Sequence, residues 1–152
     1  MNFPILSSLI LLPVIGSLFL LFSKDKNSNT AKYVALFTSF VNFLISIYLW
    51  YQFDPTTSSF QFVEDREWLK GFINYKIGVD GISILFVVLT SFITPLCIIS
   101  VNNSVKYRLR DFLIAILVME SLMIGVFCSL DLVIFYLFFE AGLIPMFLII
   151  GI

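Results

Sequence analysis

Five apolar segments, each close to twenty residues long, divide this sequence of 152 residues. They cover residues 3–22, 32–51, 81–101, 112–129 and 131–152. An α-helix of about 20 residues crosses the roughly 30 Å hydrocarbon layer of a bilayer, where backbone groups must be hydrogen-bonded internally. The sequence therefore predicts an all-α integral membrane protein with five transmembrane helices, forming a single membrane domain over residues 1–152.

The composition agrees with a lipid environment. Only 12% of the residues are charged and 60% are hydrophobic, whereas a soluble domain carries about 25% charged residues. The net charge of −1 gives no reason to expect a nucleic-acid partner. Histidine is absent, and Cys97 and Cys128 lie inside apolar segments without CxxC spacing. We therefore expect packing roles for both cysteines and no metal site.

Basic residues concentrate in two of the four connections between the segments, which predicts how the helices are oriented. Both connections are rich in Lys and Arg: Lys24, Lys26 and Lys32 beside Asp25 in the first, and Lys106, Arg108 and Arg110 beside Asp111 in the third. The second connection, residues 52–80, has three basic and five acidic residues. Because basic connections stay on the cytoplasmic or matrix side, we expect an external N-terminus and an external second connection.

The second connection also shows a strand pattern. Apolar residues flank the polar residues 64–66, and further on they alternate with polar residues at Ile73, Tyr75 and Ile77. Alternation of this kind around a polar turn predicts a small hairpin. Since an isolated hairpin is only marginally stable, we expect it to pack on the helices or on a neighbouring subunit.

Aspartates stand at the start of three apolar segments. Asp80 precedes the third, Asp111 opens the fourth and Asp131 opens the fifth. A carboxylate there accepts hydrogen bonds from free backbone N–H groups and complements the helix dipole. We expect this capping role, and for Asp80 and Asp131 a place at the mouth of an ion path is the alternative.

Two glutamates, Glu120 and Glu140, lie near the middle of the fourth and fifth segments. Ionisable groups at bilayer depth are costly, and they often carry protons or ions. If the two helices are antiparallel neighbours, both carboxyl groups sit near mid-bilayer, where they can approach one another or share a chain of water. Burial disfavours the charged form, so such a carboxyl group can bind and release protons. We therefore interpret Glu120 and Glu140 as proton-transfer residues.

The alternative for both glutamates is structural. A protonated carboxyl group can also hydrogen-bond across helices and hold them together. For Glu120 the two interpretations stay open. For Glu140 we favour proton transfer, with a charge partner supplied by another segment or another subunit.

Two motifs resemble a known family. Residues 75–83, YKIGVDGIS, resemble the YxxGxDGxS signature of the antiporter-like subunits of respiratory complex I, and residues 131–146, DLVIFYLFFEAGLIPM, resemble the fifth-helix motif of the subunit M family, called NADH dehydrogenase subunit 4 in mitochondria. The resemblance implies a multi-pass membrane subunit that takes part in proton translocation coupled to electron transfer from NADH to quinone. It implies a bacterial plasma membrane or mitochondrial inner membrane as the location.

The resemblance also implies roles and partners. The family's fifth-helix glutamate, here Glu140, pairs with a lysine on a later helix, and Glu120 matches a fourth-helix acid found in part of the family. The partners are the lipid bilayer and the other membrane subunits of the complex. NADH, FMN, iron–sulfur clusters and quinone belong to other subunits, so we expect no cofactor on this chain. The family's further helices lie beyond this sequence, which we therefore interpret as an N-terminal fragment.

Two alternatives to this function stay open. A Mrp-type cation/proton antiporter subunit shares the ancestry and the fold, although the FEAxLIPM form of residues 139–146 favours complex I. The other alternative is a truncated structural membrane bundle without transport of its own.

Overall fold

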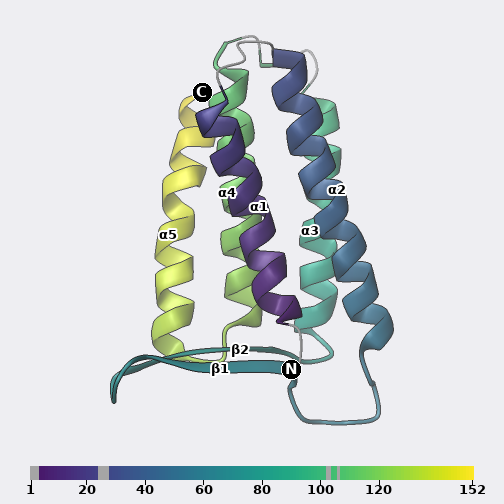
Figure 1. Cartoon of the computed structure of the whole chain (residues 1–152), viewed down its shortest axis with the longest axis vertical. Helices are drawn as coiled ribbons and strands as arrows, with labels where there is room; N and C mark the ends of the chain where they lie inside the picture. Colours follow the sequence, from purple (N-terminus) through teal and green to yellow (C-terminus); the bar gives the residue numbers. More distant parts are fainter. Residues whose placement is uncertain (1–3, 24–27, 102–103, 106) are drawn as a thin grey trace.

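The computed structural model describes residues 4–23, 28–101, 104–105 and 107–152. These residues form five helices: α1 (Ile5–Phe22), α2 (Ser28–Gln52), α3 (Ser83–Ser100), α4 (Leu109–Cys128) and α5 (Leu132–Gly151). All five are long and apolar enough to cross a membrane, so the predicted helices are confirmed. They stand side by side in one bundle, and a hairpin lies across the end at which α1 begins (Figure 1).

Two helices begin earlier than the apolar segments do. α2 starts at Ser28 instead of residue 32, and α4 starts at Leu109 instead of residue 112. Apolar character marks where lipid lies, whereas helical hydrogen bonding continues through polar residues. Lys32, which we assigned to the first connection, therefore lies inside α2. The orientation prediction also depends on Lys24, Asp25, Lys26 and Lys106, which lie outside the described part of the chain.

The capping predictions hold for two of the three aspartates. Asp131 accepts hydrogen bonds from the backbone N–H of Val133 at 2.8 Å and of Ile134 at 3.4 Å. Asp80 accepts from the backbone N–H of Ser83 at 2.8 Å, and the hydrogen bonds from Ser83 hold the pKa of Asp80 below its ordinary value.

Asp111 accepts no cap hydrogen bond, so that part of the prediction was wrong, although its carboxylate lies in the first turn, where it complements the helix dipole. It lies in the first turn of α4, where the N-cap is Arg108 in the left-handed backbone conformation. The Asp111 carboxylate accepts a hydrogen bond from Arg108 Nε at 2.9 Å, in an exposed ion pair. Exposed pairs of this kind contribute little stability, so the pair fixes the local geometry of the connection more than it stabilises the fold.

The predicted hairpin is confirmed, with its turn in a different place. Strands β1 (Gln61–Leu69) and β2 (Ile73–Val79) pair antiparallel. The polar residues 64–66 lie within β1, and the chain reverses around Gly71, whose φ is 85°. Glycine adopts this conformation without steric cost, which explains why the turn forms there.

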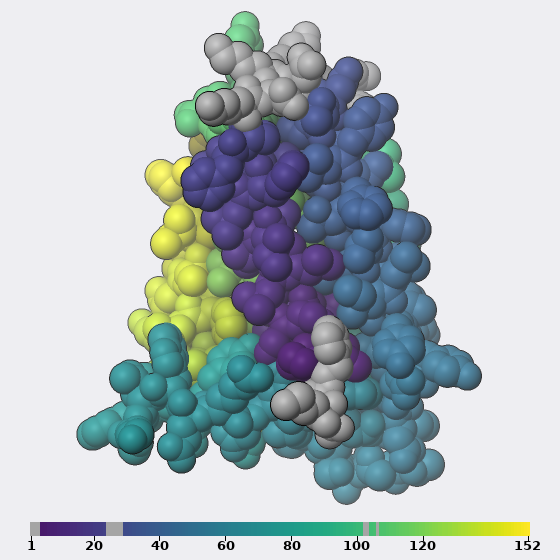
Figure 2. Space-filling model, in the orientation of Figure 1, coloured from purple at the N-terminus to yellow at the C-terminus, as the bar shows by residue number. Residues whose placement is uncertain are grey.

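The hairpin is fastened to two separate parts of the bundle. Ser7 of α1 donates a hydrogen bond from its hydroxyl group to the Glu64 carboxylate, and its oxygen lies 3.2 Å from the Tyr75 hydroxyl. The backbone N–H of Leu130, between α4 and α5, donates to the Lys76 carbonyl at 3.0 Å. The hairpin and the α4–α5 connection therefore lie at the same end of the bundle, and the hairpin extends sideways past the helices (Figure 2).

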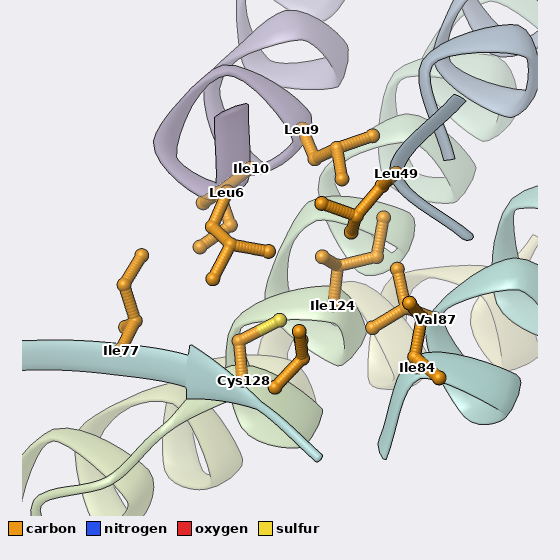
Figure 3. Packing of buried hydrophobic residues seen from close by; sticks show 10 residues of the cluster. Leu6, Leu9, Ile10, Leu49, Ile77, Ile84, Val87, Ile124 and Cys128 are labelled. Atoms are coloured by element: carbon orange, nitrogen blue, oxygen red, sulfur yellow. The ribbon is translucent and has the colours of Figure 1, made fainter. Parts of the chain in front are cut away.

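The interior has apolar residues at both ends and polar residues between them. The hairpin-end cluster is packed between the helices and β2 (Figure 3) and contains Leu6, Leu9, Ile10, Leu49, Ile77, Val79, Ile84, Val87, Ile124 and Cys128. The loop-end cluster contains Leu20, Ala31, Ala35, Ile98, Leu113 and Leu117. The buried residues between them form what we call the polar layer: Ser17, Thr38, Ser39, Asn42, Ser46, Ser91, Thr94, Glu120 and Ser121.

Glycines allow two pairs of helices to approach closely. A Cβ atom added to Gly16 of α1 would lie 2.6 Å from Thr38 of α2, and one added to Gly125 of α4 would lie 2.7 Å from the Phe138 ring of α5. Small residues at such contacts are typical of helix packing in membranes. At the end opposite the hairpin, a groove of about 320 Å³ lies between α1, α4 and α5, and its lining includes Leu21, Pro145 and Leu148.

Candidate functional site

The polar layer is formed by four helices. α1, α2, α3 and α4 each contribute buried polar side chains at the level between the two apolar clusters, whereas the buried residues of α5 are Ile134 and Pro145. A charged group within this layer would be separated from water by packed apolar side chains on both sides. Such a position penalises any polar group that lacks a partner.

Most hydroxyl groups of the layer donate to a carbonyl of their own helix, and those of Ser46 and Ser91 also lie 2.6 Å apart across the α2–α3 contact. Thr38 donates to the backbone carbonyl of Val34 at 2.8 Å, and Thr94 donates to that of Thr90 at 3.0 Å. Serine and threonine commonly bond in this way to the preceding turn of their own helix. Ser121 instead donates across the helix contact to the Ile10 carbonyl, at 2.5 Å. These side chains therefore need no further donor or acceptor.

Asn42 and Glu120 depend on each other. The Asn42 amide nitrogen donates to Glu120 Oε1 at 3.0 Å, which joins α2 to α4. Asn42 is 0% exposed and Glu120 is 2% exposed. Among the described residues, Asn42 Oδ1 and Glu120 Oε2 are the buried side-chain atoms that have no hydrogen-bond partner. The pair is thus half satisfied, in a place where each missing hydrogen bond is costly.

Glu140 has a different environment. It is exposed on α5, and neighbours on its side of the helix are exposed as well: Val133, Tyr136, Leu137, Ile144 and Phe147. A carboxyl group near the middle of an apolar helix, on a face that no described residue covers, has neither water nor a protein partner there. Such a group is expensive in lipid, so this face of α5 is suited to contact with further protein.

The structure does not bring the two glutamates together. The polar partner of Glu120 is Asn42 of α2, and Glu140 is exposed on α5. α4 and α5 are antiparallel neighbours, as expected (Figure 1). However, Glu120 points into the bundle and Glu140 away from it, because neighbouring helices at equal depth can present different faces to each other. The expectation of a direct approach is therefore wrong.

Asn42 was missed in the sequence, although a signal was present. Thr38, Asn42 and Ser46 recur every four residues in an otherwise apolar segment, which places them on one helical face. In a soluble protein a polar face points to water. In a membrane helix it points to the protein interior, and the exposed residues of α2 include Phe37 and Tyr48.

Two carboxyl groups, Glu120 and Glu140, are the ionisable side chains near the middle of the described helices. The described residues contain no group of three or more His, Cys, Asp or Glu side chains arranged to hold a metal ion. Glu120 and Glu140 are carboxyl groups in apolar surroundings, and such groups can bind and release a proton.

No family model matches the chain, whereas comparison with known proteins gives clear relatives. Over 128 residues it is 60% identical to NADH-quinone oxidoreductase subunit M of Rhodobacter capsulatus, covering 84% of this chain and 24% of that protein. Over 148 residues it is 49% identical to NADH-ubiquinone oxidoreductase chain 4 of Marchantia polymorpha, covering 97% of this chain and 30% of that protein.

A solved structure agrees with these relatives. A chain of respiratory complex I from Thermus thermophilus with bound NADH superposes with a TM-score of 0.76 at 28% sequence identity, covering 94% of this chain and 28% of that chain. The present sequence therefore spans about a third or less of the length of the proteins it matches.

Proposed function

Since the chain is a homologue of NADH-quinone oxidoreductase subunit M and NADH-ubiquinone oxidoreductase chain 4, we propose that it forms part of an antiporter-like membrane subunit of respiratory complex I. The subunit takes part in proton translocation coupled to electron transfer from NADH to quinone. Its location is a bacterial plasma membrane or a mitochondrial inner membrane. NADH, FMN, iron–sulfur clusters and quinone are held by other subunits.

The position of Glu140 carries this proposal. It is a carboxyl group near the middle of α5, on an apolar face that the described helices leave uncovered. We propose that further helices of the complex cover this face and that a basic side chain from one of them pairs with Glu140. A carboxyl group next to a cation in low dielectric changes its proton affinity when the cation moves, as proton transfer requires.

Glu120 has the second role in the proposal, as a proton-transfer group inside the bundle. Its buried position and its single amide partner support this assignment. The named relatives are subunits of NADH oxidoreductases, which favours this function over a Mrp-type antiporter or a purely structural bundle.

We also propose that the hairpin end of the bundle faces the external side. It carries five acidic residues in the connection between α2 and α3, whereas the opposite end carries Arg108 and Arg110. Basic residues in short connections stay on the cytoplasmic or matrix side.

Cysteine labelling tests this orientation. In a background of Cys97→Ser and Cys128→Ser, the variant Phe72→Cys in the hairpin turn should react with a membrane-impermeant maleimide added outside intact cells or right-side-out vesicles. Tyr107→Cys at the other end should react only after permeabilisation. The two positions are 90% and 85% exposed, so accessibility within the protein is matched. The reverse pattern would overturn the orientation.

Glu140→Gln in the assembled complex tests the function. We expect proton translocation driven by NADH oxidation to fall by at least about tenfold, since a positioned proton-transfer group contributes about 10²- to 10⁴-fold. The measurement is the initial rate of proton uptake into vesicles, normalised to the amount of assembled complex.

Glu67→Gln is the matched control. Glu67 is exposed on the hairpin, so the same chemical change outside the bundle should leave proton uptake unchanged. Normal uptake in the Glu140→Gln variant would remove Glu140 from the proton path.

A further inference from the structure

Two neighbouring side chains of the polar layer, Asn42 and Glu120, each have one oxygen atom without a hydrogen-bond partner. The Asn42 amide and the Glu120 carboxyl group are both planar and forked, and one arm of each fork is joined by the hydrogen bond from Asn42 Nδ2 to Glu120 Oε1. The two remaining arms, Asn42 Oδ1 and Glu120 Oε2, are both oxygen atoms and both lack a donor. Two acceptor oxygens cannot satisfy one another unless one of them carries a proton.

The charges around the pair do not favour an ionised carboxylate. α1 and α3 contain no charged residue, and the charged residue of α2 is Lys32, ten residues or about 15 Å from Asn42 along the helix. On α4 itself the other charges are Arg110 and Asp111, in its first turn. α5 contributes Glu140, which is exposed and carries the same sign as Glu120. An ionised Glu120 would thus be a buried charge with no nearby cation, which is strongly unfavourable.

We propose that Asn42 and Glu120 form a proton-binding site in the centre of the bundle, in which Glu120 carries its proton on Oε2 and donates it to Asn42 Oδ1. One proton then satisfies both unpaired atoms and closes a ring of two hydrogen bonds between α2 and α4. Asn42 is a positioning residue, because it acts through Glu120. This site deepens the proposed function, on which its part in proton transfer rests, but its occupancy can be measured without any transport.

The layer's surroundings make this site an occluded one. Asn42 and Glu120 are 0% and 2% exposed, and buried apolar clusters lie on both sides of them along the helices. When the proton leaves, Asn42 Oδ1 loses its donor and Glu120 becomes an uncompensated charge. The bundle must then admit water or a cation at this level, or separate α2 from α4. Proton occupancy and the α2–α4 contact are therefore linked.

Infrared difference spectroscopy of the whole chain in lipid nanodiscs tests the site. All samples carry Glu140→Gln, so that Glu120 is the one carboxyl group left near the middle of a described helix. At neutral pH, the spectrum without a further change minus that of Glu120→Gln should contain the C=O stretch of a protonated carboxylic acid, shifted down in D₂O. A difference containing carboxylate bands alone would overturn the proposal, and would indicate an ionised Glu120 bridged by water.

Asn42→Leu separates the positioning role from a structural one. The acid band should persist but move to higher frequency, because the carbonyl loses the hydrogen bond from Asn42. Ser46→Ala, one turn further along the same buried face, is the matched control and should leave the band in place. An unchanged band in Asn42→Leu would refute the pair.

A second measurement tests the site without the Glu120→Gln variant, in case that variant does not fold. Labelling glutamate carboxyl groups with ¹³C in the Glu140→Gln chain, with Glu120 intact, should move the acid band to lower frequency, and no such shift would overturn the site. The infrared result is also independent of pumping. A protonated Glu120 together with normal proton uptake in the Glu140→Gln complex would uphold the site and reject the proposed role of Glu140.

Discussion

α4 and α5 are neighbouring helices of equal length and similar hydropathy, yet they occupy opposite environments. In an 18-residue stretch of α4, 44% of the residues are buried inside the protein, whereas the corresponding share in α5 is 11%. Each carries one glutamate near its middle, and one of these is buried against an amide while the other is exposed. Depth in the membrane therefore does not determine what surrounds a carboxyl group.

The difference arises from the angle around each helix. Glu120 follows Leu117 by three residues and precedes Ile124 by four, so it lies on the buried row of α4. Glu140 is six residues from Ile134 and five from Pro145, the two buried residues of α5. At 3.6 residues per turn those spacings place it roughly 120–140° away from the packed face.

Replacing Glu140 should have a large effect on α5 as a membrane segment and little effect on the folded bundle. Glu140→Leu should favour membrane insertion of the isolated α5 segment by about 3 kcal/mol, because a charged residue at a helix centre is penalised and Leu is not. The stability of the folded chain should hardly change, since no described side chain covers this face. Insertion is measured by glycosylation mapping of the segment in a host protein, and stability by denaturant titration followed by circular dichroism. A destabilised fold would show that Glu140 is buried.

Glu120 should respond in the opposite way. Glu120→Leu leaves both polar atoms of Asn42 without a partner, and we expect it to lower the free energy of unfolding by about 1–2 kcal/mol. Glu120→Gln keeps the shape and supplies an N–H donor in place of the carboxylic O–H, so it should stay within about 0.5 kcal/mol of the unaltered chain. The same titration measures both, and equal losses in the two variants would contradict a neutral, hydrogen-bonded Glu120.

The contact between α4 and α5 at Gly125 should show a smaller effect. Gly125→Ala places a methyl group 2.7 Å from the Phe138 ring, and we expect a loss of about 1 kcal/mol from the displaced ring. Gly142→Ala on α5 is the control, because a Cβ atom there meets nothing within 4 Å. If the two substitutions have the same effect on the unfolding midpoint, the close approach at Gly125 does not hold α5 in place.

The parts of this fold that local chemistry determines were predictable. Hydropathy identified five helices, the alternation at Ile73, Tyr75 and Ile77 identified the hairpin, and the carboxyl group of Asp131 identified a helix start. Each depends on residues that are neighbours in the sequence. The turn lies at Gly71 and not at the more polar residues 64–66, because glycine adopts the positive φ that the turn requires whereas polarity alone does not produce a turn.

The long-range pairings were not predictable in the same way. Glu120 and Asn42 are 78 residues apart, and the choice of Asn42 depends on how α2 is rotated against α4. In a membrane helix nearly every side chain is apolar, so hydropathy does not indicate the buried face. The spacing of Thr38, Asn42 and Ser46 is the signal that would have given it.

Among the described residues, the hairpin adds hydrogen bonds at one end of the bundle and none at the other. It straps the first turn of α1 to the connection that precedes α5, through Glu64 and Lys76, whereas the far half of α5 borders a groove beside Pro145 and Leu148. α5 is thus held near its first residue by the hairpin, and it has open space beside its far half. An approaching helix would therefore displace the far half of α5 more easily than the end beside the hairpin.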